Sequence, residues 1–261
     1  MTDNLVLAVE SAKKAGVKIL NFYGDQGEVK SKIDGSPLTH ADCASHDLLT
    51  EALSSTGIPI VSEEGESLRL EVDTYWLIDP LDGTKDFLAQ NDEFTVNIAL
   101  VQNAKPIMGV IHAPALGETY AGGIDHSPWF EKNGDRSLLG SIPKSKNCRM
   151  AVSRFHDHPD VGVFAKINQI EKRIEVGSAL KYGLLARGEV DVVPRLVGSS
   201  EWDVAAGQAI VESAGGRVLD WHTTIPLSYG KLGRRNPRLL SFRSPYHLSD
   251  FTLMNYEPEL L

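Results

Sequence analysis

Asp79-Pro80-Leu81-Asp82-Gly83-Thr84 places two carboxylates three residues apart, directly after the apolar run 75–78. That run consists of strand-forming residue types and predicts a short buried strand. Pro80 and Gly83 are expected to end the strand in a turn, which bends the second carboxylate back beside the first. Two carboxylates so close together repel each other unless a cation lies between them. Hard oxygen ligands around an open position suit Mg²⁺, which completes its coordination with water and phosphate.

Two further acidic features are candidates for the same centre. Glu63 and Glu64 follow the apolar run 58–61, so they also leave the end of a predicted strand. Asp203 opens a helical pattern over 203–213. On their own, the glutamates could form an exposed acidic loop, and the aspartate could only complement a helix N-terminus. The candidate metal ligands are Glu63, Asp79, Asp82 and Asp203.

A third acidic feature lies at the start of another predicted helix. Thr39 and Asp42 have the spacing of a capping box, in which each side chain bonds to the backbone near the other residue. Asp42 could serve only this cap, and Thr84 could be only a turn hydroxyl. If the two side chains meet, they form a hydrogen-bonded pair beside the predicted metal site.

Three motifs, taken together, resemble the magnesium-dependent, lithium-sensitive phosphatases of the inositol monophosphatase superfamily. The motifs are Glu63-Glu64, Trp76-Leu77-Ile78-Asp79-Pro80-Leu81-Asp82-Gly83-Thr84 and Trp202-Asp203-Val204-Ala205-Ala206-Gly207. They occur in the family's order and span nearly the whole chain. The resemblance is closest to the 3′(2′),5′-bisphosphate nucleotidase branch, on the stretches 83–87, 93–99 and 177–182.

This resemblance implies a phosphomonoesterase with two or three Mg²⁺ ions. It adds the backbone carbonyl of Leu81 to the ligand set and prefers Glu63 to Glu64. It also implies that Asp42 and Thr84 orient the attacking water. Lys181 and Arg195 match substrate-binding positions, although each could be an ordinary solvated charge. The implied substrate-binding residues are Gly83, Thr84, Lys85, His156, Ser178, Lys181, Arg195 and Asp203.

The implied substrate is a small phosphorylated nucleotide, 3′-phosphoadenosine 5′-phosphate, which would be converted to AMP and phosphate in sulfate assimilation. One alternative is an inositol or sugar-phosphate phosphatase with the same chemistry. An alternative of another class is an inactive phosphate-binding regulatory protein that kept the fold. Such a protein would be free to lose the carboxylates and Thr84, so their presence favours an enzyme.

The composition sets wider limits. The 261 residues can bury a large core, and a net charge of −9 argues against binding of a nucleic-acid polymer. Cys43 and Cys148 provide no disulfide framework, and no apolar run reaches the roughly 18–20 residues of a membrane span. We expect a cytoplasmic protein, a monomer or homodimer, either in solution or peripheral to the inner face of the membrane.

The pattern of predicted elements indicates an α/β protein with two halves. Helical spacing at 5–19 and 41–52 precedes alternating, strand-like runs from 94 to 132, which predict an antiparallel meander. Beyond residue 149, strands and helices alternate. We therefore expect an α+β half over 1–140, with most metal ligands, and an α/β half over 141–261, with Asp203 and the substrate-binding residues. The resemblance sharpens this to a layered α-β-α-β-α sandwich.

Overall fold

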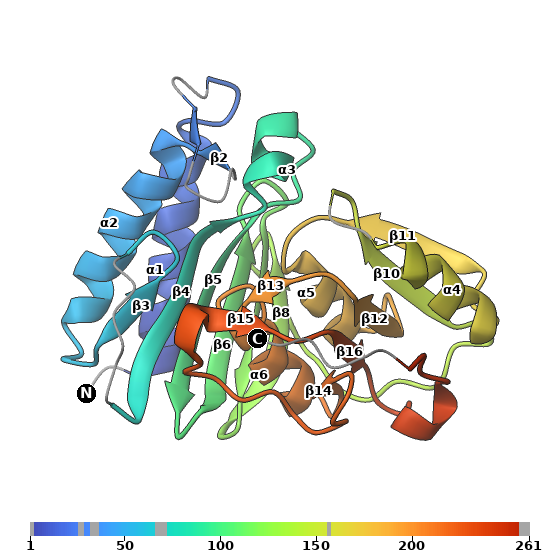
Figure 1. Cartoon of the computed structure of the whole chain (residues 1–261). Helices are drawn as coiled ribbons and strands as arrows, with labels where there is room; N and C mark the ends of the chain where they lie inside the picture. Colours follow the sequence, from blue (N-terminus) through green and yellow to red (C-terminus); the bar gives the residue numbers. More distant parts are fainter. Residues whose placement is uncertain (1–2, 26–28, 32–36, 66–71, 156–157, 256–261) are drawn as a thin grey trace.

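The computed structural model describes residues 3–25, 29–31, 37–65, 72–155 and 158–255. The first layer consists of α1 (Asn4–Leu20) and α2 (His40–Ser54), which lie side by side (Figure 1). The apolar residues of α1 recur at helical spacing and are buried against the neighbouring sheet. The predicted capping box of Thr39 and Asp42 is confirmed at the start of α2. Between the two helices, β1 (Lys30–Ser31) and β2 (Pro37–Leu38) form a short antiparallel ribbon.

The second layer is a large sheet whose strands follow one another in chain order. In the described part of the chain it contains β3 (Ile60–Ser62), β4 (Thr74–Asp82), β5 (Thr95–Gln102), β6 (Lys105–Ala113), β7 (Glu118–Gly123), β8 (His126–Lys132) and β9 (Asp135–Leu138). Only β3 and β4 pair in parallel within this sheet as described; the other neighbours are antiparallel. The predicted meander is therefore confirmed.

Both faces of this sheet are buried. Successive side chains of β5 point to opposite faces, and apolar residues occupy both of them. Val96 and Ile98 belong to the core shared with α1 and α2, whereas Ala99 and Val101 belong to the core on the other face. The third layer, α5 (Leu180–Arg187) and α6 (Ala205–Ser213), covers that second face. Gly109 of β6 permits a close approach, since a Cβ there would lie 2.3 Å from the carbonyl oxygen of Ala206.

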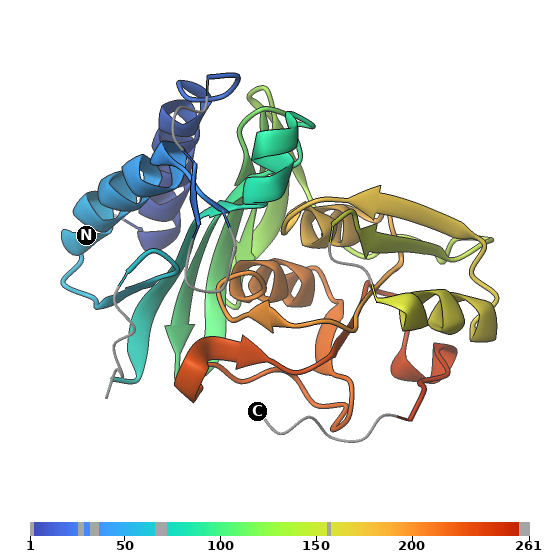
Figure 2. The same cartoon turned by 45° about the horizontal axis from the view of Figure 1, so that its top comes forward.

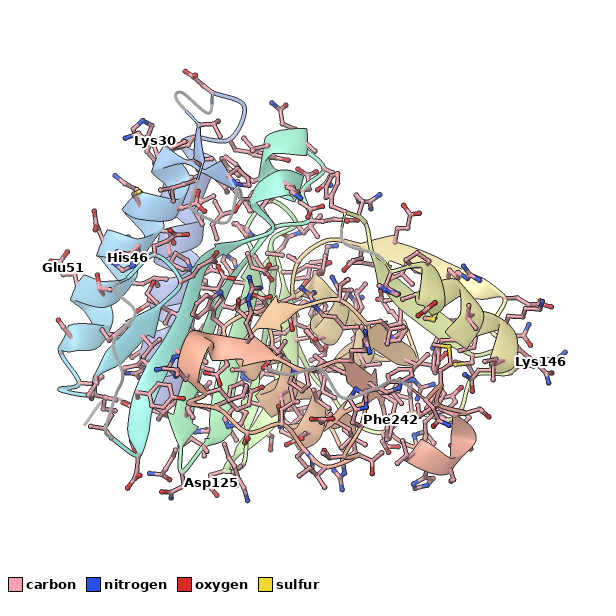
Figure 3. All side chains as sticks on the ribbon, viewed as in Figure 1. Lys30, His46, Glu51, Asp125, Lys146 and Phe242 are labelled. Atoms are coloured by element: carbon pink, nitrogen blue, oxygen red, sulfur yellow. The ribbon has the colours of Figure 1, made fainter. Side chains whose placement is uncertain are left out.

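The fourth and fifth layers belong to the C-terminal half. The smaller sheet has the order β11 (Lys172–Val176), β10 (Arg149–Ser153), β12 (Val192–Arg195), β16 (Leu239–Phe242) and β14 (Arg217–Asp220). Its outer face packs on α4 (Pro159–Ile167) through a core that includes Val152, Phe164 and Phe242. Figure 2 shows α4 at the far end of the molecule from α1 and α2. Side chains fill the spaces between these layers (Figure 3).

This order of layers confirms the α/β class and the α-β-α-β-α sandwich. The remaining elements are α3 (Thr84–Ala89), the ribbon of β13 (Ser199–Ser200) with β15 (Arg235–Asn236), and the 3₁₀ turns η1 (Leu232–Arg234) and η2 (Leu248–Asp250). The predicted boundary near residue 140 falls between β9 and β10, but the division into two domains stays a prediction. Within the described ranges, every helix is too short or too polar to cross a membrane.

Candidate active site

A β-bulge in β4 brings Asp79 and Asp82 to the same side of the sheet. Asp79 lies opposite Asn97 on β5, whereas Asp82 lies opposite Thr95, so three steps on one strand match two on the other. In a regular strand, side chains three residues apart point to opposite faces. The extra residue of the bulge therefore places both carboxylates on the same face. The prediction that Pro80 ends the strand is wrong, because β4 continues to Asp82. Proline is tolerated there because a bulge leaves a residue without ladder bonds.

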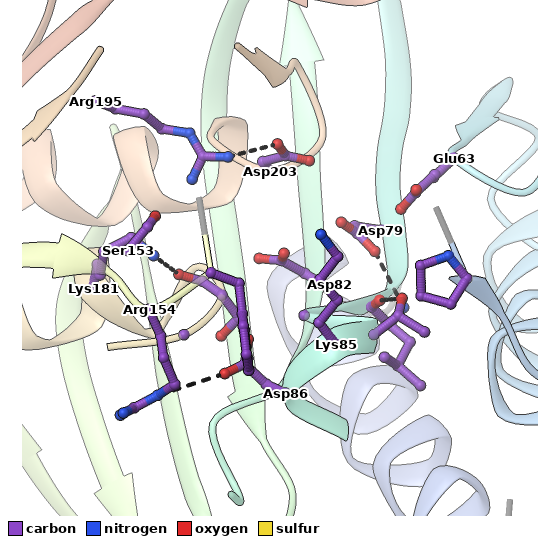
Figure 4. A pocket seen from close by; sticks show the side chains of 17 residues that line it. Glu63, Asp79, Asp82, Lys85, Asp86, Ser153, Arg154, Lys181, Arg195 and Asp203 are labelled. Atoms are coloured by element: carbon purple, nitrogen blue, oxygen red, sulfur yellow. Dashed lines mark hydrogen bonds and ion pairs between the residues drawn. The ribbon is translucent and has the colours of Figure 1, made fainter. Parts of the chain in front are cut away.

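The end of β4 opens into a cleft of about 330 Å³ between the two halves of the chain. Figure 4 shows Glu63 and Asp79 on one side of this cleft and Arg154 on the other. The cleft brings together most of the residues predicted from the sequence. Its predicted lining residues are Glu63, Asp79, Leu81, Asp82, Gly83, Thr84, Lys85, Ser178, Lys181, Arg195 and Asp203. His156, the other predicted substrate contact, lies outside the described residues.

Burial and mutual repulsion raise the pKa values of two carboxylates in the cleft. Burial raises the pKa of Asp79 well above its usual value, and the charges of Glu63, Asp82 and Asp203 raise it further. Burial also raises the pKa of Asp203 to about 7; Arg195 opposes this shift, while Asp82 and Glu63 add to it. Such a cluster is stabilised by a bound cation.

The donors at the cleft are hard oxygen atoms that leave an open position. Among the described side chains, no group of three or more acids, histidines or cysteines is close enough to enclose a metal ion by itself. Mg²⁺ needs no such enclosure, because it usually binds one or two carboxylates and keeps water and phosphate as further ligands. The carbonyl oxygen of Leu81 is a further candidate metal ligand here. It lies 3.4 Å from the Thr84 hydroxyl oxygen.

Hydrogen bonds from backbone and side-chain groups fix the orientation of two of these carboxylates. Asp82 accepts hydrogen bonds from Asn97 Nδ2 at 3.1 Å and from the backbone N–H of Ala179 at 2.6 Å, so it joins the two halves. Asp203 lies just before α6, two residues outside the helix predicted to start with it. Its Oδ2 accepts from the backbone N–H of Ser200 at 2.9 Å and pairs with Arg195 at 3.4 Å.

Asp42 and Thr84 meet, as the sequence led us to expect. Asp42 Oδ2 accepts from the backbone N–H and the hydroxyl of Thr39, at 2.8 and 2.6 Å. The other oxygen, Oδ1, accepts from Thr84 Oγ1 at 3.3 Å. The cap therefore fixes Asp42, and Asp42 in turn orients a hydroxyl that lines the cleft.

Helix α2 also supports the segments that carry the other acidic groups. Ser45 Oγ donates to the carbonyl of Pro80 at 2.7 Å, in the middle of the bulge. His46 Nδ1 lies 2.8 Å from Ser62 Oγ, next to Glu63. Neither contact could be predicted from the sequence, because a serine or histidine on a helix does not indicate which residue it will contact.

Lys181 and Arg195 lie at the cleft in different settings. Lys181 is buried, and its Nζ donates to the carbonyls of Val176 and Ser178 at 3.2 and 2.7 Å. Burial lowers its pKa to about 8, and Arg195 contributes to this shift. Arg195 Nε is buried and has no hydrogen-bond partner in the described part of the structure. Both cationic groups are thus positioned beside the carboxylates.

Comparison with known proteins identifies this arrangement. The model of the inositol monophosphatase family matches residues 2–243. The chain belongs to the inositol monophosphatase family. A 3′(2′),5′-bisphosphate nucleotidase CysQ from Shigella flexneri is 37% identical over 225 residues, 84% of this chain and 90% of the relative. The protein of the same name from Escherichia coli K12 is 36% identical over 225 residues, which again cover 84% of this chain and 90% of the relative.

Solved structures of the inositol monophosphatase family agree with the fold. CysQ from Bacteroides thetaiotaomicron matches with a TM-score of 0.82 at 35% identity, covering 93% of this chain and 98% of that one. A Thermotoga maritima IMPase matches with a TM-score of 0.78 at 25% identity, covering 92% of each chain. The resemblance to this family inferred from the sequence is therefore confirmed.

The cleft also contains residues that the sequence analysis missed. Ser153 ends β10, and Arg154 and Phe155 follow it; all three line the cleft. Figure 4 shows Ser153 and Arg154 on the side away from Glu63. Their types carry no phosphatase signal, so only the fold reveals them. The remaining lining residues that were not predicted are Pro37, Asp86 and Gly177.

Proposed function

We propose that this chain is a magnesium-dependent 3′(2′),5′-bisphosphate nucleotidase, which hydrolyses the 3′-phosphate of 3′-phosphoadenosine 5′-phosphate to AMP and phosphate. The convergence of Glu63, Asp79, Asp82 and Asp203 on one cleft carries this proposal. The names of the bacterial relatives support the choice of substrate. A cytoplasmic location and a monomeric or dimeric state stay predictions from the sequence.

The metal ions would be held by oxygen donors alone. We assign this role to Glu63, Asp79, Asp82, Asp203 and the carbonyl of Leu81, for two or three Mg²⁺ ions. Bound Mg²⁺ supplies Lewis-acid chemistry, since it acidifies water and neutralises charge on a phosphate. The raised pKa values of Asp79 and Asp203 support this assignment, because burial and neighbouring carboxylates disfavour the charged forms that a bound cation would stabilise.

Asp42 and Thr84 would orient the attacking water. The Thr84 hydroxyl lies within hydrogen-bond distance of both Asp42 Oδ1 and the Leu81 carbonyl. With the carbonyl on a metal ion, the hydroxyl would donate its hydrogen bond to Asp42, and its oxygen lone pairs would accept one from water. Asp42 cannot easily turn away, because the Thr39 cap holds its other oxygen. In this proposal the pair fixes the direction of attack on phosphorus.

The phosphate groups would contact the rest of the cleft. We expect the scissile phosphate to contact the backbone N–H groups of Gly83 and Thr84, with Lys85 nearby. The second phosphate would be bound by Ser178, Lys181 and Arg195. The unpartnered Nε of Arg195 supports this role, because a buried donor is stabilised by an acceptor.

Substrate comparison tests this function. Phosphate release is measured from 3′-phosphoadenosine 5′-phosphate and from inositol 1-phosphate, each with Mg²⁺ and with excess chelator. We expect turnover of the nucleotide with Mg²⁺ only, at a higher kcat/KM than for the inositol ester. Preference for inositol 1-phosphate would favour the sugar-phosphatase alternative. Hydrolysis undiminished by chelator would contradict the metal assignment, and no turnover of either ester would favour the inactive binding protein.

A further inference from the structure

The lining of the cleft contains an aromatic side chain that packs into none of the described apolar cores. Phe155 lines the cleft and is 44% exposed. Among the described lining residues it is the one aromatic side chain. It belongs to none of the three apolar cores of the described chain, and no described ring stacks on it. Small-molecule sites are commonly lined by aromatic side chains, so an exposed ring that lines a cleft and belongs to no core is a candidate contact for a ligand.

The backbone next to Phe155 is held in place by its neighbour. Arg154 Nη2 donates to Glu93 Oε2 at 2.8 Å and to the carbonyl of Glu175 at 3.2 Å. Glu93 in turn accepts from the backbone N–H of Gly177 at 2.8 Å. These bonds tie the residues after β10 to β11 and to the segment before β5. The ring is thus presented on a supported wall.

The same bonds balance the charge of Arg154 within the protein. Both carboxylate oxygens of Glu93 accept from Arg154, and Asp86 lies 3.9 Å from the same guanidinium. The charge of Arg154 is therefore balanced by protein acids, and the other described cations that line the cleft are Lys85, Lys181 and Arg195. What this wall offers a ligand is the flat apolar face of Phe155.

We propose that Phe155 recognises the base of a nucleoside bisphosphate whose scissile phosphate lies at the carboxylates. This inference rests on the proposed function and specifies its substrate class. A nucleobase has a flat π face that stacks on an aromatic ring, whereas an inositol or sugar ring presents hydroxyl groups. A cleft of about 330 Å³ is within the usual range for small-molecule sites.

The test compares two substrates that differ only in the base. kcat/KM is measured for 3′-phosphoadenosine 5′-phosphate and for ribose 3,5-bisphosphate, with Phe155→Ala, Phe155→Leu and Phe155→Trp. We expect Phe155→Ala to lose roughly 5- to 150-fold on the nucleotide, the range for loss of base–aromatic stacking. The same variant should change less than about two-fold on the abasic substrate. Phe155→Trp should retain nucleotide activity, and Phe155→Leu should lie between the two.

The outcomes separate this inference from the proposed function. Equal losses of Phe155→Ala on both substrates, or no loss on the nucleotide, would overturn the role of Phe155 and leave the nucleotidase intact. No hydrolysis of either bisphosphate by the unaltered protein would overturn the proposed function and this inference with it. Thermal unfolding of each variant shows whether the fold is retained.

Discussion

Asp79 occupies an electrostatically unfavourable position, because its buried carboxylate lies near three other acids. Asp79→Asn keeps the size of the side chain and removes its charge. We expect phosphatase activity to fall by more than about a hundred-fold, the upper range for losing a group that merely supports a metal ligand. Without metal, the variant should be more stable by on the order of 1 kcal/mol, because like charges no longer repel.

Urea unfolding with chelator and phosphate release with Mg²⁺ measure these two effects. Asp125→Asn is a matched control, since Asp125 is exposed in the β7–β8 turn (Figure 3). It should change neither quantity. Full activity of Asp79→Asn would rule out Asp79 as a metal ligand.

His112 predicts a sensitivity to acid that is independent of the active site. Burial lowers its pKa to about 4, from 6.5, and Nδ1 lies 2.9 Å from Thr119 Oγ1. Between these values the unfolded chain binds a proton that the folded chain does not, so stability falls as the pH falls. The free energy of unfolding should decrease by about 2 kcal/mol between pH 7 and pH 5 from this residue.

The difference between the wild type and His112→Gln isolates this contribution. Urea unfolding of both proteins at pH 7 and pH 5 gives the change in the free energy of unfolding with pH for each protein. This change can be compared even if the variant is less stable at both pH values. The variant should lose less stability on acidification. Identical slopes would show that His112 titrates normally.

At the same scale, the sequence predicted residues whose chemistry is specific and missed those whose role depends on position. The acids and Thr84 lie in a long motif of unusual composition. Ser45 and Arg154 are common surface types, and only the fold places them against Pro80 and Glu93. Nothing local distinguishes them from solvated residues.

Gly83, where β4 passes into α3, shows what a single backbone angle contributes to an element. Its φ is +87°, and a Cβ there would lie 3.1 Å from Ser178 Cβ. Gly83→Ala should cost about 1–2 kcal/mol of stability, because an L-residue is strained in this region. It should also reduce activity by on the order of a hundred-fold, since in the proposed mechanism a small displacement of Thr84 would misdirect the attacking water.

Gly24→Ala separates these two effects. Gly24 has a similar φ of +94°, and no atom within 4 Å would meet its Cβ. This variant should therefore lose a similar amount of stability in urea unfolding and keep its phosphatase activity. If both variants kept full activity, the turn at Gly83 would not position the catalytic pair.

Element types were easier to predict than their junctions. Periodicity identified α1, α2 and the strands of the meander, because burial of one face or both follows directly from residue type. The same reasoning ended β4 at Pro80, which the structure contradicts. Proline usually stops a strand because it lacks an N–H group, but the bulge removes the need for that donor. Strand pairing decides this point, and a single sequence does not show it.

The two halves depend on each other for burial. Leu77, Ala99 and Val101 of the large sheet share a core with Ala206 and Ile210 of α6. Expressed separately, fragments 1–140 and 141–261 should each lack cooperative unfolding, because each exposes a large apolar face. Their co-expression should restore a folded, active complex. Circular dichroism during heating and phosphate release check both statements, and cooperative unfolding of 1–140 alone would contradict the first.

The position of α6 also has a consequence for synthesis. The ribosome releases the chain from its N-terminus, so the large sheet is complete at Leu138 long before Ser213 ends the helix that covers it. At about 5–20 residues per second, the roughly 75 residues between them take on the order of 4–15 s to translate. For that interval the nascent chain leaves one apolar face of the sheet uncovered. Rapid translation of this segment, or a ribosome-associated chaperone, would protect it from aggregation.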